Sequence, residues 1–114
     1  MATDFIVKGE WATKNEYNVS LALDYYEIEY EFHVDVLGGS AVRGGYVIDF
    51  VINIPWQVPL EVFGNYWHEG YLSDGDKLKL ANIQDYYGVI PIIIWGNESD
   101  TPEQARDAIK DKVL

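Results

Sequence analysis

The sequence predicts an α+β domain with a mainly antiparallel β-sheet of about five to six strands and one C-terminal α-helix. Apolar and polar residues alternate in several short segments, and Gly, Pro and Asn separate those segments. Residues 99–114 instead have the spacing of a helix. Because 114 residues suffice for one hydrophobic core, residues 1–114 are expected to form a single domain.

The strands are expected in a simple order along the chain. A first hairpin is followed by a bulge at Tyr25 and Tyr26, where the apolar positions change from odd to even numbers. The Gly-rich segment 38–45 is expected to connect two strands. The predicted strands cover residues 5–11, 17–23, 26–36, 46–54, 78–83 and 89–95, and the last two are joined by a turn at 84–88.

The C-terminal helix has the clearest local signals. Thr101 is a good N-cap, Pro102 suits the first helical position, and Gln104 completes a capping box. Apolar residues then recur four positions apart, at Ala105, Ile109 and Val113. This helix is expected to pack against the sheet or beside it.

Charge is the most unusual property of the composition, because 8 basic residues face 19 acidic ones and give a formal net charge of −11. A field of that sign repels DNA, RNA and anionic lipid and attracts basic proteins. The absence of cysteine excludes disulfides and thiolate chemistry. No segment has the length and apolarity of a membrane span, so a cytoplasmic protein, in the host cytoplasm if viral, is expected.

Catalytic motifs are largely missing, and no enzyme is expected. The Gly-rich segment 38–45 lacks the lysine and hydroxyl of a phosphate-binding loop, and neither His33 nor His68 belongs to an HExxH helix. Glu31, His33 and Asp35 are the best metal-ligand candidates. Alternate strand residues are roughly 7 Å apart, whereas zinc needs every ligand atom within about 2.0–2.2 Å. No metal or other cofactor is therefore expected.

Residues 24–36 predict a row of carboxylates along one face of a strand, formed by Glu27, Glu29, Glu31 and Asp35. Neighbouring charges at this spacing repel by only about 0.6 kcal/mol per pair in water, so a solvated face is sufficient to explain the row. The same row also forms a continuous anionic strip that loosely mimics a phosphate backbone.

Three adjacent aromatic pairs, Tyr25–Tyr26, Tyr66–Trp67 and Tyr86–Tyr87, would each place one ring outward if they lie in strands. Exposed Tyr and Trp are enriched at protein interfaces. Tyr25, Trp67 and Tyr87 are therefore candidate anchors of a binding surface. A small cluster beneath a loop is the structural alternative for each pair.

These features favour a non-catalytic acidic protein that inhibits or sequesters a basic partner, which would itself handle nucleic acid. In size, acidity and lack of motifs the chain is similar to phage anti-defence inhibitors and toxin immunity proteins. Glu27, Glu29, Glu31 and Asp35 would supply the charge. A sugar-binding or virion structural module, which would use the outward aromatics, is a further alternative.

Residues 60–95 resemble the later strands of oligonucleotide-binding (OB-fold) domains of the replication protein A type. Gly75-Asp76, the alternating Leu78, Leu80 and Ile83, and the Tyr86 to Gly88 turn carry the resemblance. It implies an OB-like or half-open barrel. It also implies direct binding of single-stranded nucleic acid, with Lys77 and Lys79 near the backbone and Tyr86 as a stacking platform.

Overall fold

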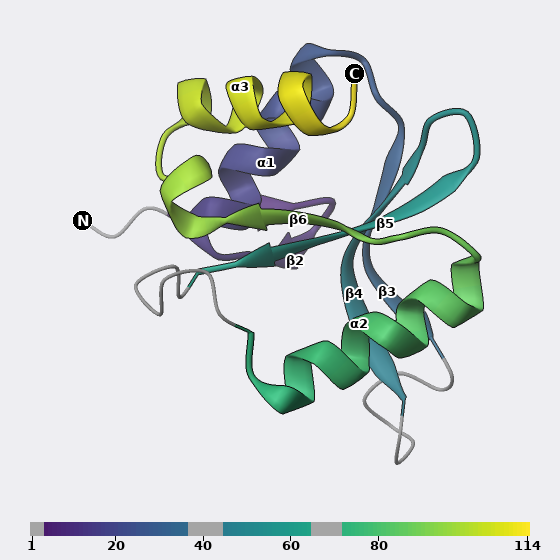
Figure 1. The fold of residues 1–114 in the computed structure, drawn as a ribbon. Helices are drawn as coiled ribbons and strands as arrows, with labels where there is room; N and C mark the ends of the chain where they lie inside the picture. The colour runs from purple at the N-terminus through teal and green to yellow at the C-terminus, as the bar shows by residue number, and fades with distance from the viewer. Residues whose placement is uncertain (1–3, 37–44, 65–71) are drawn as a thin grey trace.

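The structure is a computed structural model that describes residues 4–36, 45–64 and 72–114. Figure 1 shows its helices and strands. In chain order they are β1 (Ile6–Val7), β2 (Glu10–Trp11), α1 (Lys14–Tyr25), β3 (Tyr30–Val36), β4 (Tyr46–Asn53), β5 (Gln57–Phe63), α2 (Asp74–Tyr87), β6 (Ile92–Trp95), the short 3-10 helix η3 (Gly96–Glu98) and α3 (Pro102–Lys112).

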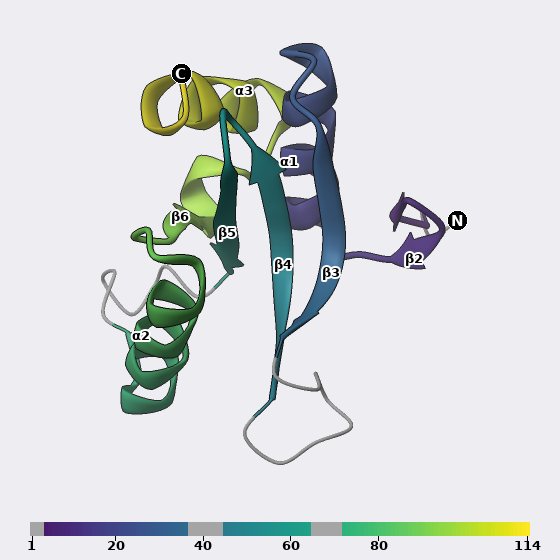
Figure 2. The same cartoon turned by 90° about the vertical axis from the view of Figure 1, so that its right-hand side faces the viewer.

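The main sheet has four strands in the order β3-β4-β5-β6. Strand β4 is antiparallel to both β3 and β5, and β6 runs parallel to β5. Helices α1 and α3 lie together on one face, and α2 lies on the other (Figures 1 and 2). The α+β class with a mainly antiparallel sheet is confirmed. The described residues form three α-helices instead of the one expected, and their sheet is open and not a closed barrel.

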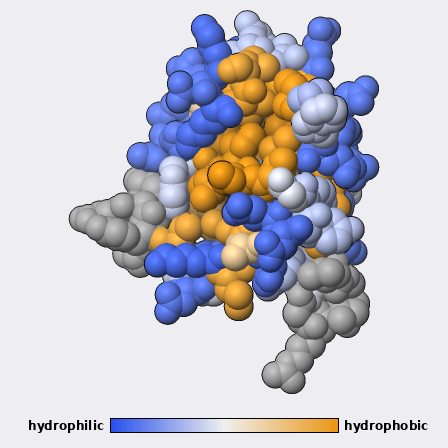
Figure 3. Space-filling view, turned by 45° about the vertical axis from the view of Figure 1, so that its right-hand side comes forward, coloured by the Kyte–Doolittle hydropathy of each residue, from blue (hydrophilic) through white to orange (hydrophobic). Residues whose placement is uncertain are grey.

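Two hydrophobic clusters hold these layers together. The larger one packs α1 and α3 against the sheet and includes Leu23, Phe50 and Ile109. The smaller one packs Ile83 of α2 against Ile48 and Val51 of β4. On the side of the molecule seen in Figure 3, hydrophobic residues gather in a band with hydrophilic residues on both sides.

The predicted strand over residues 17–23 is wrong, because this segment belongs to α1. Val19, Ala22 and Leu23 are buried and lie three and four positions apart, which places them on one helical face. Thr13, which lies between the first two predicted strands, is the helix N-cap, and Thr13 and Glu16 form a capping box. The third predicted strand is correspondingly shorter and begins at Tyr30.

The predicted strand over residues 78–83 is also wrong, because these residues lie within α2. The helix begins after the N-cap Ser73 and ends at Gly88, which has the left-handed φ of 72° that glycine adopts at low cost. Most of the predicted turn at 84–88 is therefore helical. The segment that suggested an OB-fold, residues 60–95, holds β5, α2 and β6.

The strand predicted over residues 5–11 is instead a small hairpin of β1 and β2, because the chain turns at Lys8 and Gly9, which both have positive φ. The remaining predicted elements are present. Helix α3 has the expected N-cap at Thr101 and a capping box with Gln104. Strand β4 matches the expected strand over 46–54, and β6 covers the end of the strand predicted over 89–95. The connection at 38–45 lies almost wholly outside the described residues. Within the part of the chain that the structure describes, no helix is long and apolar enough to span a membrane.

Candidate functional site

Strands β4 and β5 separate at a point marked by two carboxylates. Their backbone pairing extends from Asn53↔Gln57 to Phe50↔Leu60. Beyond it, the Val62 backbone N–H donates to Asp49 Oδ2 at 2.8 Å, and the Asp49 backbone N–H donates to Glu61 Oε1 at 3.4 Å. Figure 2 shows β4 continuing past the end of β5. Where the two strands diverge, side-chain carboxylates thus accept the hydrogen bonds that backbone carbonyls accept in the paired part of the sheet.

Glu61 is the most deeply buried charged residue described, with 2% of its surface exposed. Its Oε2 lies 3.2 Å from Nζ of Lys79, which reaches it from α2. A buried carboxylate is costly unless it is paired and hydrogen-bonded, and Lys79 supplies that pairing. The lysine is therefore fixed beside Glu61, one of the two carboxylates at the strand separation.

Glu16 approaches the same point from α1. The Thr13 backbone N–H donates to Glu16 Oε1 at 2.8 Å, which is one half of the capping box. The other oxygen, Oε2, lies 3.9 Å from Nε2 of His33. The helix cap thus holds one carboxylate oxygen and leaves the other directed at the sheet.

His33 lies opposite Asp49 in the β3–β4 register, between the pairs Phe32↔Phe50 and Val34↔Ile48. Its φ of 52° is uncommon for a residue other than glycine. The ring stacks on Phe32 with centroids 3.7 Å apart, and Nδ1 lies 3.5 Å from Glu10 Oε1 on the β1–β2 hairpin. The unusual backbone at His33 places its ring over the site.

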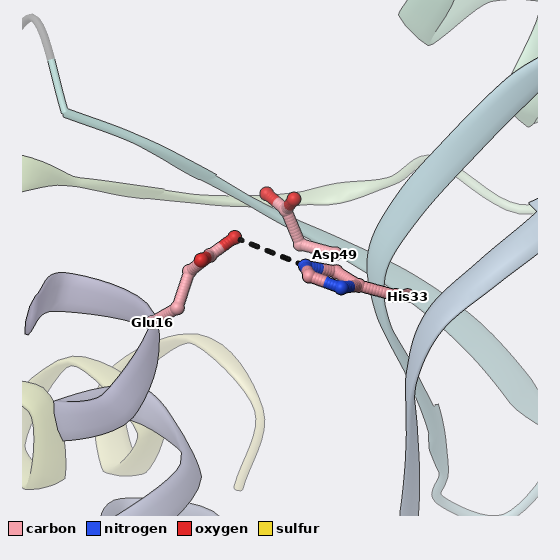
Figure 4. Close-up of side chains that lie close together, drawn as sticks. All are labelled: Glu16, His33 and Asp49. Atoms are coloured by element: carbon pink, nitrogen blue, oxygen red, sulfur yellow. Dashed lines mark ion pairs between the residues drawn. The ribbon is translucent and has the colours of Figure 1, made fainter. Parts of the chain in front are cut away.

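Ligand atoms of Glu16, His33 and Asp49 all lie within 4.8 Å of one another (Figure 4). In octahedral coordination with bonds of about 2.1 Å, ligand atoms are about 3.0 Å apart when adjacent and about 4.2 Å apart when opposite. Movements of less than about 1 Å would therefore allow these three residues to hold one ion. The carboxylates of Glu16, Asp49 and Glu61 outnumber the one ammonium group, that of Lys79, by two. The cluster thus suits a divalent cation in both spacing and charge.

The same crowding changes the protonation of the cluster. Burial, followed by the charge of Glu61, raises the pKa of Asp49 from 3.8 to about 7. Burial also raises the pKa of Glu16, which the hydrogen bond from Thr13 partly offsets. Without a cation, the cluster therefore retains a proton near neutral pH.

Stability of the metal-free protein is expected to fall as pH rises from about 4 to about 7, through the contribution of Asp49. In that range the folded state keeps a proton that the unfolded chain has released, so alkalinisation favours unfolding. Thermal unfolding in EDTA across this range, compared between the wild type and Asp49→Asn, measures the contribution. The decline should be smaller in the variant. Added Mn²⁺ should raise Tm more at pH 8 than at pH 5, and equal stabilisation at both would contradict the assignment.

The predicted acidic strip does not form along one strand face. Glu27, with φ of 56°, and Glu29 precede β3. Residues on either side of His33 belong to different clusters, since Phe32 packs in the larger one and Val36 in the smaller one. The even-numbered side chains therefore change faces at His33, which places Glu31 and Asp35 on opposite faces of β3.

The other predicted site residues lie on helices or outside the described residues. Tyr25 ends α1 and is exposed, with the Arg106 guanidinium 4.9 Å from its ring centroid. Tyr86 is exposed and Tyr87 is half-buried at the end of α2. Lys77 is exposed on that helix, whereas Lys79 joins the carboxylate cluster. Trp67 lies outside the described residues.

Sequence reasoning missed Glu16, Asp49 and Glu61. The available signal was one acidic residue inside an otherwise apolar strand, as in YVIDFVI for Asp49 and VPLEVF for Glu61. Such a residue requires a buried partner or a ligand.

Comparisons with protein-family models, curated proteins and solved structures found no match.

Proposed function

We propose that the protein is a divalent-metal-dependent hydrolase of nucleic-acid phosphodiesters, that is, a nuclease. One observation carries the proposal. Carboxylates from α1, β4 and β5 converge with Lys79 and His33 at the separation of two strands. Three carboxylates that repel one another, two of them with raised pKa values, gain most from a divalent cation.

Each residue has a distinct expected role. Glu16 and Asp49 would hold the cation with His33, and their oxygen ligands favour Mg²⁺ or Mn²⁺. When bound, the cation polarises a phosphoryl oxygen and lowers the pKa of a water molecule. Lys79 places a positive charge beside the negative oxygens of the phosphate, and Glu61 positions that lysine. The oxygen of water forms the new bond to phosphorus while one sugar oxygen leaves as a hydroxyl.

Phosphodiester hydrolysis fits these residues better than acyl transfer does. The sequence has no cysteine, and among the described residues the charged neighbours of His33 are carboxylates, namely Glu10, Glu16 and Asp49. That arrangement lacks an activated nucleophile. The net charge of −11 repels a nucleic acid overall, so the cation and Lys79 must supply local attraction. Few phosphates would be contacted, and binding should depend only weakly on salt.

Cleavage of end-labelled single-stranded DNA, duplex DNA and RNA tests the proposal directly. We expect products with Mg²⁺ or Mn²⁺ and none with EDTA. Glu16→Gln keeps an oxygen for the helix cap but loses the charge, so it should fold normally and cleave slowly. Glu31→Gln, an exposed glutamate of β3, is the matched control and should cleave like the wild type. Absence of cleavage with any of these substrates and cations would contradict the proposal.

A second candidate is the acidic binding protein predicted from the sequence. It is favoured by Glu27, Glu29 and Glu31, which line an open pocket of about 610 Å³ together with Asp24 and Lys8. Exposed carboxylates of this kind favour a basic protein partner through electrostatic steering. The variant with Glu27, Glu29 and Glu31 all replaced by Gln should leave phosphodiester cleavage unchanged. It should bind a basic protein more weakly, and that binding should depend less on salt. Unchanged binding would exclude this role for the pocket.

A further inference from the structure

A second pocket, of about 650 Å³, lies at the turn between β4 and β5. Its lining residues are aromatic, amide-bearing or proline, and none is charged: Asn53, Pro55, Trp56, Gln57, Tyr86 and Tyr87. Trp56 is 72% exposed and Tyr86 is 58% exposed. Large aromatic rings left this open are poorly explained by packing and suit a planar or apolar ligand.

The elements that carry the carboxylate cluster also carry this pocket. Asp49 and Asn53 are four positions apart on β4, which corresponds to roughly 13 Å, and Glu61 and Gln57 have the same spacing on β5. Lys79 and Tyr86 are two helical turns apart on one face of α2, or roughly 10.5 Å. The pocket is thus at a fixed distance from the cluster, within reach of a nucleotide close to the cleaved bond.

The chemistry of the pocket matches an unpaired nucleobase. Aromatic side chains stack on bases, and stacking tolerates any sequence because every base has a π-face. The amides of Asn53 and Gln57 offer donors and acceptors for the edge of a base. Without a charged lining residue, the pocket does not suit a phosphate. A base-binding pocket also explains how a protein of charge −11 could hold a polyanion, since stacking needs no basic surface.

We propose that this pocket binds an unpaired base of the substrate strand and stacks it on Trp56 and Tyr86. The inference rests on the proposed function and specifies its substrate as a single-stranded or locally unpaired nucleic acid. A base within a duplex is already stacked on its neighbours and would have to be released first. Single strands should therefore be cleaved with a lower KM than duplexes of the same sequence.

Trp56→Ala tests this inference, with Trp11→Ala as the matched control because Trp11, in β2, is 70% exposed and outside the pocket. The substrates are a single-stranded oligonucleotide and bis(p-nitrophenyl) phosphate, which has no base. Trp56→Ala should raise KM for the oligonucleotide by about 5- to 100-fold. It should leave turnover of the small substrate unchanged. Trp11→Ala should change neither, and identical behaviour of the two variants would overturn the inference.

Binding without cleavage separates this inference from the proposed function. Fluorescence anisotropy of the labelled oligonucleotide is measured with the wild type, Trp56→Ala and Trp11→Ala in EDTA. If the wild type never cleaves but its binding is lost only in Trp56→Ala, the base pocket is retained and the hydrolase is rejected. Binding of a neutral oligosaccharide through Trp56, without binding of the oligonucleotide, would overturn the inference and assign the pocket to sugars.

Discussion

Replacing Asp49 with asparagine is expected to lower the rate of metal-dependent cleavage by about 10²- to 10³-fold. Asp49 contributes a candidate ligand atom to the cluster and also accepts a hydrogen bond from Val62. Asparagine keeps the size and an acceptor oxygen but lacks the negative charge that attracts a cation. The measurement is the initial rate of oligonucleotide cleavage in Mn²⁺ at pH 8.

Stability distinguishes loss of chemistry from loss of folding in this variant. Because ionisation of Asp49 is unfavourable in the metal-free fold, Asp49→Asn should unfold at an equal or higher temperature than the wild type at pH 8 in EDTA. Asp35→Asn, which changes an exposed carboxylate of β3, should match the wild type in rate and Tm. Cleavage at the wild-type rate by Asp49→Asn would exclude the residue from the reaction.

Lys79→Met is expected to affect both stability and cleavage. The substitution leaves Glu61 buried without its ion-pair partner, and the free energy of unfolding should fall by about 2–3 kcal/mol, since Lys79 is itself partly exposed. Cleavage should fall by about 10²-fold because a positive charge beside the phosphate is lost. Urea unfolding and the cleavage assay, on the same preparation, measure the two effects.

Two further variants separate these effects. Lys77→Met, at an exposed position of the same helix, should change neither quantity appreciably. The double variant Lys79→Met with Glu61→Gln removes the unpaired charge, so it should recover most of the lost stability while remaining slow in cleavage. Recovery of cleavage in the double variant would show that Lys79 acts only by stabilising the fold.

The two helices missed by the sequence prediction illustrate the limit of periodicity. In residues 17–23, odd-numbered apolar residues fit a strand, while Val19, Ala22 and Leu23 fit a helix equally well. The Thr13 and Glu16 capping box was the deciding signal. Ile83 is the one residue of α2 that is buried among the described residues. The helix therefore lacks the row of buried apolar residues, three and four positions apart, that would have indicated it. There the N-cap Ser73 and the terminal Gly88 were the informative residues.

The candidate site was less predictable than the fold, for a topological reason. Glu16, Asp49, Glu61 and Lys79 lie on four different elements, and only the register of β4 against β5 brings the middle two together. The sequence indicates one member, His33, as a possible ligand, with Glu31 and Asp35 of its own strand as the other candidates. The partners instead lie on α1 and across the sheet on β4. Strand spacing argues against three ligands on one strand, and the neighbours of His33 follow only from the tertiary structure.

Manganese binding to the intact protein at pH 8 tests the central claim most directly. Isothermal titration of the wild type should show saturable binding of one Mn²⁺ per chain, absent in Asp49→Asn and unchanged in Asp35→Asn. A paramagnetic ion bound there should also broaden the imidazole resonances of His33. Absence of saturable binding, or equal binding by Asp49→Asn, would contradict a metal centre at Glu16, His33 and Asp49.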